Sequence, residues 1–180
     1  MKINKFTALC FSTLFAGILF FAYQQGWLVI RLPLYSSSAR TLSAADTTKK
    51  NVKLIFWHNG TWHTEYQELI WGASTEKNCL YLINTWLTLL DEENIMDKHV
   101  TLQSALAPSG QEMYLSFDRS PFQPEDTTFT KWMWIEGLLK TLRENEVKLT
   151  SVQLLVDHQP LIDQHLDFTN PWPLCGFIEK

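Results

Sequence analysis

Positive charge is what this sequence most clearly lacks. Of its 180 residues, 15 are lysine or arginine and 19 are aspartate or glutamate, for a formal net charge of −4. Lys2 and Lys5 are the only charged residues before Arg31, so the rest of the chain carries about −6. A protein that follows a phosphate backbone needs a basic surface, so this balance argues against nucleic-acid binding.

Cysteine is scarce as well, and the common catalytic and metal motifs are missing. The 3 cysteines are Cys10, Cys79 and Cys175, and none has the CxxC or Cys/His spacing of a zinc site. In an exported domain Cys79 and Cys175 either form one disulfide or stay independent buried thiols. The sequence contains neither a Gly-rich phosphate loop nor a G-x-S-x-G nucleophile motif. We therefore expect no cofactor and no metal.

A long apolar run near the start of the chain is its most distinct feature. Residues 6–23, from Phe6 to Tyr23, contain no charge, and as a helix they span roughly 27 Å, close to the thickness of the hydrocarbon layer. Because Lys2 and Lys5 precede this run, the N-terminus is predicted to be cytoplasmic and the rest of the chain to lie outside. A cleaved signal peptide is the alternative, but no A-x-A cleavage site follows the run.

Composition divides the chain into three predicted parts. Residues 1–35 form the membrane anchor, in a single pass. Residues 36–50 (SSSARTLSAADTTKK) are small and polar without periodicity, which is typical of a flexible linker. Residues 51–180 form the folded domain.

The domain begins with a predicted hairpin and a helix. Asn59-Gly60 separates apolar runs at 52–57 and 61–66, and both turn residues tolerate positive φ. A helix follows, capped by Ser74 or Thr75 and ending in the polar run after Leu90. Its apolar positions recur at helical spacing: Leu80, Ile83, Leu87 and Leu90, with Trp86 beside them.

The second half of the domain repeats this alternation. Strands are predicted at 99–107, where Val100, Leu102 and Leu106 share a face, and at 112–118, where Met113, Leu115 and Phe117 do. A second helix, capped by Asp126 or Thr127, carries the following apolar stripe: Phe129, Trp132, Ile135, Leu139 and Leu142. A strand at 152–156 completes the order ββ-α-ββ-α-β, and a short tail strand follows it. We expect an α+β two-layer sandwich, with a mostly antiparallel sheet and both helices on one face.

Several short motifs resemble the GerMN (sporulation and spore germination) domain family. They are Tyr114-Leu-Ser-Phe-Asp118, Val152-Gln-Leu-Leu-Val-Asp-His158 and the closing Gln164-His-Leu-Asp-Phe168. His158 stands where a turn glycine is common in the family. The resemblance implies a membrane-anchored or lipid-anchored envelope domain that binds or assembles, and the family has no established catalytic residues to carry over to this chain.

Side chains with catalytic or metal-binding chemistry occur in three places. His58 and His63 flank the hairpin turn, with Glu65 nearby, but no third metal ligand has a spacing that fixes it beside the two histidines, so exposed turn residues are the simpler interpretation. Asp91, Glu92 and Glu93 are interpreted as a solvated surface rather than as glycosidase carboxylates. The third group lies near the C-terminus and consists of Asp157, His158, His165 and Asp167. Ser116 or Ser151 can be imagined as a nucleophile beside these residues. The simpler interpretation is that Asp157 forms a turn and Asp167 bonds to the backbone.

Tryptophan is abundant, at 8 residues, and supplies the candidate binding residues. Trp132 and Trp134 are two positions apart on one predicted helix, so they cannot face the same way, and one must be exposed or covered by another surface. Exposed aromatic side chains favour partner contacts, and the candidates are Trp57, Trp62, Trp132 and Trp134. The alternative is a satellite core beneath the hairpin, which also contains Trp71.

Together these features predict a non-enzymatic domain outside a bacterial cell membrane that binds another envelope protein or itself. The alternative is a protein that binds or hydrolyses the peptidoglycan cell wall, because tryptophans stack on sugars. A hydrolase needs a deep cleft with converging polar groups, whereas an interaction domain offers a flat patch or a free sheet edge.

Overall fold

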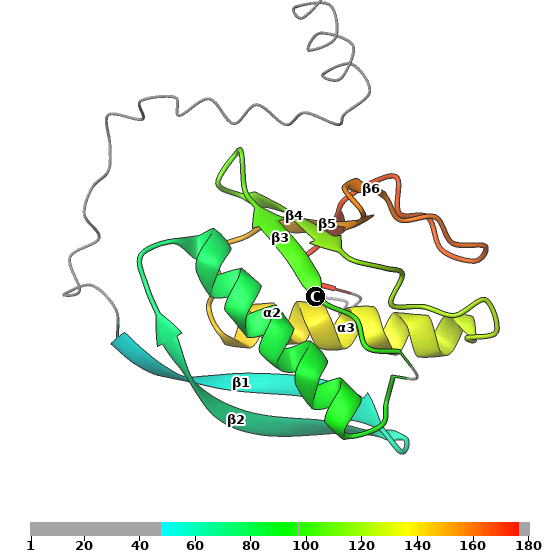
Figure 1. The fold of residues 1–180 in the computed structure, drawn as a ribbon, viewed down its shortest axis with the longest axis horizontal. Coiled ribbons are helices and arrows are strands. Elements are labelled where there is room, and N and C mark those ends of the chain that lie inside the picture. The colour runs from blue at the N-terminus through cyan, green and yellow to red at the C-terminus, as the bar shows by residue number, and fades with distance from the viewer. Residues whose placement is uncertain (1–47, 97, 177–180) are drawn as a thin grey trace, which may run out of the picture. The chain divides into compact units, whose positions relative to one another are not determined.

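The computed structural model describes residues 48–96 and 98–176 (Figure 1). The chain divides into two units between residues 42 and 43, and every described residue belongs to the second unit. The predicted anchor at 6–23 lies outside the described residues. Within them, no helix combines the length and apolar character needed to cross a membrane. The first strand begins at Thr48, so the last three residues of the predicted linker are strand instead.

The order of elements follows the predicted ββ-α-ββ-α-β sequence, with two short strands at the end where one tail strand is predicted. The bounds are β1 (Thr48–His58), β2 (Thr61–Trp71), α2 (Thr75–Glu92), β3 (Leu102–Leu106), β4 (Glu112–Phe117), α3 (Thr128–Glu144), β5 (Ser151–Val156), β6 (Gln159–Pro160) and β7 (Trp172–Pro173). The α+β class is confirmed. Ser74 and Thr127, each one of two predicted alternatives, are the N-caps, and their side chains accept hydrogen bonds from backbone N–H groups three residues on.

The predicted hairpin is confirmed and is longer than expected. Asn59 and Gly60 have φ values of 50° and 80°, the conformation of a tight two-residue hairpin turn. The antiparallel register runs from His58↔Thr61 to Thr48↔Trp71 and forms a two-stranded sheet. β1 alternates as a half-buried strand does, and its buried side chains are Val52, Leu54 and Phe56.

The expectation of a single sheet is wrong, although four of the five described strand pairings are antiparallel, as expected. The remaining strands form a second sheet in the order β3-β4-β5-β6, with β7 also paired to β5. β4 and β5 are parallel, because α3 carries the chain from the end of one to the start of the other. β5 buries three successive residues, Val152, Gln153 and Leu154, as a strand that is covered on both faces does.

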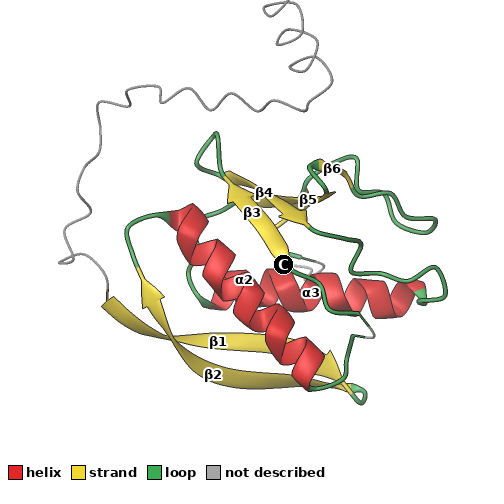
Figure 2. Cartoon of the chain, in the orientation of Figure 1, coloured by secondary structure: helices red, strands yellow, loops and turns green. Residues whose placement is uncertain are grey.

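The helices lie between the two sheets rather than on one face of a single sheet (Figure 2). α3 runs along β1, and α2 contacts both the hairpin and β3. One continuous core includes Leu54 from β1, Leu82 from α2, Leu138 from α3 and Leu115 from β4. The helices therefore bury side chains in two directions.

This position changes the predicted stripe of α3. Ile135, Leu139 and Leu142 are buried as expected, but Phe129 and Trp132 are exposed. The prediction assumed one covered face, whereas α3 is buried almost all round from residue 134 to 142 and projects past its neighbours only in its first turns.

A β-bulge corrects the predicted face of β3. The register to β4 shifts between Leu102 and Ser104, so one residue of β3 has no partner. Beyond the bulge the alternation is reversed: Ala105 is buried and Leu106 is exposed. The predicted buried face of β4 is confirmed.

Side chains from both helices bond to the outer edge of β1. Asn145, which is 2% exposed, accepts a hydrogen bond from the Lys53 N–H (3.0 Å) and donates one to the Lys53 carbonyl (2.7 Å). The Thr141 hydroxyl oxygen accepts from the Ile55 N–H (3.0 Å), and Trp86 Nε1 donates to the Ile55 carbonyl (2.8 Å). Backbone groups that another strand would otherwise pair with are thus satisfied, and the hairpin is fixed on the helices.

One ion pair and one hydrogen bond from a second, intrahelical ion pair fix the C-terminal segment to α3. Lys131, which is 1% exposed, bonds through Nζ to Asp163 Oδ2 (2.5 Å). Arg143 pairs with Glu136 (3.1 Å) and also donates to the Leu174 carbonyl (2.8 Å). Buried charges are tolerated only when they are paired in this way.

Candidate functional site

The four candidate tryptophans take three different positions. Trp57 and Trp62 are cross-strand partners in the hairpin, half-buried, with ring centroids 5.2 Å apart. On α3, Trp132 is 39% exposed and Trp134 only 9%. The two helix tryptophans therefore face different ways, as their spacing predicts, and Trp134 is not on the outer surface.

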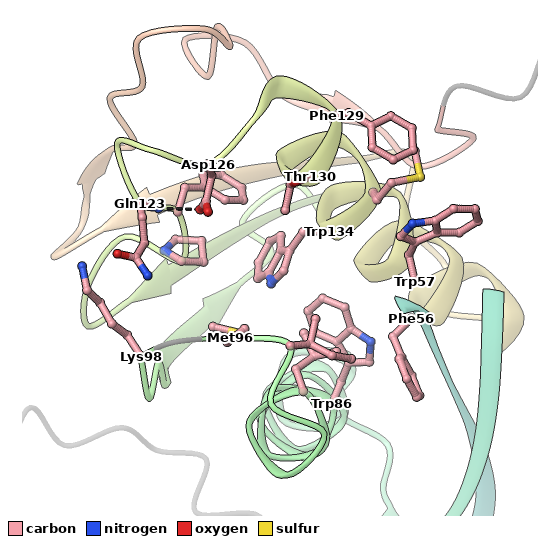
Figure 3. Close-up of a pocket in the computed structure, with 15 residues that line it drawn as sticks. Phe56, Trp57, Trp86, Met96, Lys98, Gln123, Asp126, Phe129, Thr130 and Trp134 are labelled. Carbon is pink, nitrogen blue, oxygen red and sulfur yellow. Dashed lines mark hydrogen bonds between the residues drawn. The ribbon is translucent and has the colours of Figure 1, made fainter. Parts of the chain in front are cut away.

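Trp134 and Trp57 both line a small cavity of about 130 Å³, the aromatic pocket (Figure 3). The pocket lies where β1, the end of α2, the loop before α3 and the first turns of α3 meet. Six of its 15 lining residues are aromatic: Phe56, Trp57, Trp86, Phe122, Phe129 and Trp134. Four separate segments of the chain thus converge on one apolar space.

The inner wall of the pocket is held rigidly. The Trp134 ring makes edge-to-face contacts with Trp86 (centroids 5.1 Å apart) and Phe122 (5.3 Å) and with Phe117 of β4 (6.0 Å). Trp86 is itself fixed by its hydrogen bond to the Ile55 carbonyl. The wall is therefore formed before any ligand arrives.

Trp134 also carries an unusual polar group. Its ring nitrogen, Nε1, is shielded from solvent and has no hydrogen-bond partner among the described residues. In Figure 3 this nitrogen is directed toward the space between Met96 and Trp86. Buried polar groups are nearly always hydrogen-bonded, so such a donor calls for an explanation.

Polar side chains lie at the mouth of the pocket rather than at its base. Lys98 and Thr130 are exposed, and Asp126 and Gln123 are half-buried. The Gln123 N–H donates to Asp126 Oδ2 (2.6 Å), which fixes the loop before α3. The pocket therefore has an apolar interior and a polar rim, as small-ligand sites and the central pockets of protein interfaces have.

The hairpin histidines do not form a metal site with their neighbours. His63 Nε2 lies 3.0 Å from the Thr61 hydroxyl and 3.2 Å from the His58 carbonyl, and the two imidazole centroids are 6.1 Å apart. Over residues 48–96 and 98–176, no group of three or more His, Cys, Asp or Glu side chains is placed to hold a metal ion.

The C-terminal histidine and aspartate residues have structural roles. Asp157 and His158 form the β5–β6 turn with φ values of 47° and 63°. Ser116 is buried, and its hydroxyl oxygen accepts a hydrogen bond from the His158 N–H (2.9 Å). Asp167 accepts from the Thr169 N–H (2.8 Å), the backbone bond that the sequence predicts.

The cysteines and the acidic run contribute nothing to the pocket. Cys79 is buried and Cys175 exposed, and they are not bonded to each other, so neither predicted alternative describes them fully. Asp91 pairs with His99 at the surface (3.2 Å), and Glu92 and Glu93 are exposed, as expected of a solvated run.

The sequence does not reveal the pocket, because its walls are distant along the chain. The sequence places Trp86 beside the apolar face of one helix and Phe129 in the apolar stripe of the other, and Phe122 lies in a loop between prolines that gives no periodic signal. Of the four tryptophans that the sequence predicts as partner-binding residues, Trp57 and Trp134 line the pocket.

Comparison with known proteins gives a structural likeness only. No family model and no curated protein matches the sequence. A candidate lipoprotein from Clostridium perfringens is similar in structure, with a TM-score of 0.48, 15% identity, and coverage of 71% of this chain and 88% of the other.

The second similar structure contains tandem GerMN domains, of the sporulation protein GerM from Bacillus subtilis, the domain type that the sequence motifs resemble. Its TM-score is 0.47 at 16% identity, with 76% of this chain covered, and the chain spans about half (49%) of that structure. At these values neither likeness bears on the partners or the activity of this chain.

Proposed function

We propose that this chain is a membrane-anchored, non-catalytic domain outside the cell membrane that binds another envelope protein at the aromatic pocket. The observation that carries the proposal is the pocket itself: a preformed aromatic cavity with exposed aromatic side chains beside it. Phe129, at its mouth, is 60% exposed, and Trp132, on the same turns of α3, is 39% exposed. Aromatic anchors in well-packed pockets dominate the binding energy of protein interfaces.

The arrangement of polar groups favours binding over hydrolysis of the cell wall. Lys98, Gln123 and Asp126 lie around the rim, and the described lining residues do not bring a pair of carboxylates or a nucleophile and base together at the base of the pocket. The anchor and its orientation come from the sequence alone, from the uncharged run at 6–23 and the lysines before it.

Site-specific photocrosslinking in the native envelope tests this function. A photoreactive phenylalanine analogue replaces Phe129 in the full chain, and a matched control carries it at Ile162, which is 92% exposed and does not line the pocket. We expect irradiation to give a discrete protein adduct from position 129 and none of that mass from position 162. No adduct at position 129, or the same adducts at both positions, would refute partner binding at the pocket. An adduct of twice the chain's mass would identify the partner as a second copy.

A further inference from the structure

We propose that the aromatic pocket binds the phenol ring of a tyrosine side chain presented by the partner, and that Trp134 Nε1–H donates a hydrogen bond to the tyrosine hydroxyl. This inference rests on the proposed function and names the group that the pocket recognises. Three properties of the pocket support it: its volume, its lining and its unpartnered donor.

The volume limits the occupant to one small ring. A cavity of about 150 Å³ lined by apolar side chains holds benzene in a well-studied engineered case, and the aromatic pocket is about 130 Å³. Drug-sized ligands occupy several hundred cubic ångströms. A single six-membered ring fits this space, whereas a lipid chain or a sugar chain exceeds it.

The lining selects an aromatic ring over a charged or amide side chain. The rings of Phe56, Trp86, Phe122 and Trp134 offer edges and faces for aromatic contacts. A carboxylate or ammonium group would be buried there without a charged partner, and an amide would leave its own N–H groups unsatisfied. Phenylalanine, tyrosine or a similar ring is therefore the expected occupant.

The unpartnered donor selects tyrosine over phenylalanine. Trp134 Nε1–H can only donate, so it requires an acceptor, and a phenol oxygen is the acceptor that an aromatic side chain of this size can bring. Nε1 is shielded in the free chain, so the ligand must displace a lining side chain. Met96 and Met133 line the pocket, and the unbranched methionine side chain adapts readily.

A matched pair of soluble probes tests the inference on the full chain in mild detergent. N-acetyl-tyrosinamide and N-acetyl-phenylalaninamide differ only by the hydroxyl group. The chain is labelled with ¹⁵N in its indole rings, and the signal missing from Trp134→Phe assigns Trp134. We expect the tyrosine probe to shift the Trp134 indole signal downfield with saturation, and to bind about threefold to tenfold more tightly than the phenylalanine probe.

Two variants separate the hydrogen bond from the shape of the pocket. Trp134→Phe removes the donor and should bind both probes equally, whereas Trp132→Phe, at the exposed neighbour, should keep the preference for tyrosine. The inference would be overturned if the unmodified chain bound the two probes equally, or if the Trp134 indole signal showed no saturable shift. Neither outcome depends on whether a variant folds. The crosslinking outcome is independent. An adduct at Phe129 without tyrosine preference leaves partner binding standing and this inference refuted. Tyrosine preference without an adduct refutes binding of an envelope partner at the pocket and leaves only the recognition of a free tyrosine ring by Trp134.

Discussion

Replacing Asn145 by alanine is the sharpest test of how the hairpin is fixed on the helices. The Asn145 side chain pairs both the N–H and the carbonyl of Lys53, at 3.0 and 2.7 Å. An unpaired buried backbone group costs about 1–3 kcal/mol. Because Lys53 is half-buried, water can reach part of the gap, so we expect Asn145→Ala to lower the free energy of unfolding by about 2–4 kcal/mol.

Urea unfolding of the full chain in mild detergent, followed by tryptophan fluorescence, measures this change. The midpoint should fall while the slope with urea stays constant, because the same surface is exposed on unfolding. Asn170→Ala is the control, because Asn170 is exposed and, among the described residues, its side chain makes only a 3.4 Å contact to the neighbouring Thr169 hydroxyl. We expect this variant to change the free energy of unfolding by no more than about 0.5 kcal/mol. If Asn145→Ala and Asn170→Ala lower the free energy of unfolding by the same amount, Asn145 does not hold the edge of β1.

Two further predictions concern titratable groups. Burial acts to raise the pKa of Asp163, but its bonds to Lys131 and to backbone N–H groups lower it overall. The unfolded chain therefore binds this proton at a higher pH than the folded chain, so the stabilisation is complete above about pH 4 and is lost as the pH falls through the folded-state pKa. Asp163→Asn should flatten this acid decline in urea midpoints, and an unchanged decline would contradict the assignment. Burial, with Glu76 nearby, raises the pKa of Cys79 to about 12. Iodoacetamide at about pH 8 should therefore modify exposed Cys175 and spare Cys79 until urea is added, as read by peptide mass spectrometry; equal labelling would refute this.

Elements defined by local signals were predictable from the sequence. Asn59-Gly60 specifies its turn because both residues adopt positive φ readily, and the buried face of β4 follows from strict alternation. The sequence predicts α2 because its apolar residues recur at helical spacing. In each case the information lies within a few residues of the element that it determines.

Pairing between distant segments was not predictable in the same way. The order ββ-α-ββ-α-β is compatible with one sheet or two, and the chain forms two because Asn145 and Thr141 of the α3 region, rather than another strand, pair the outer edge of β1. Asn145 and Lys53 are 92 positions apart, and no periodicity connects them. The bulge after Leu102 likewise depends on pairing with β4, since nothing in the local alternation marks it.

The contacts that hold the hairpin also shape the pocket, so the two features depend on each other. Trp86 forms one wall of the pocket, and the same indole ring donates to Ile55, next to Phe56 on β1. α3 approaches β1 closely because it has glycine at position 137: a Cβ there would lie 3.2 Å from the Ile55 carbonyl oxygen. An occupant of the pocket would touch the hairpin, both helices and the loop before α3 at once.

The unpartnered indole of Trp134 is best understood against this packing. Phenylalanine at position 134 would also place an aromatic ring between Trp86 and Phe122, and it has no N–H group to bury. The buried N–H group of Trp134 has no acceptor among the described residues, which costs about 1–3 kcal/mol. Local choices that work against stability tend to concentrate at functional sites. A ligand that accepts from Nε1 removes this cost only in the bound state, so the donor weakens the empty domain and strengthens the complex. Trp134 Nε1 is unfavourable without an acceptor, and for that reason it selects a ring that carries one.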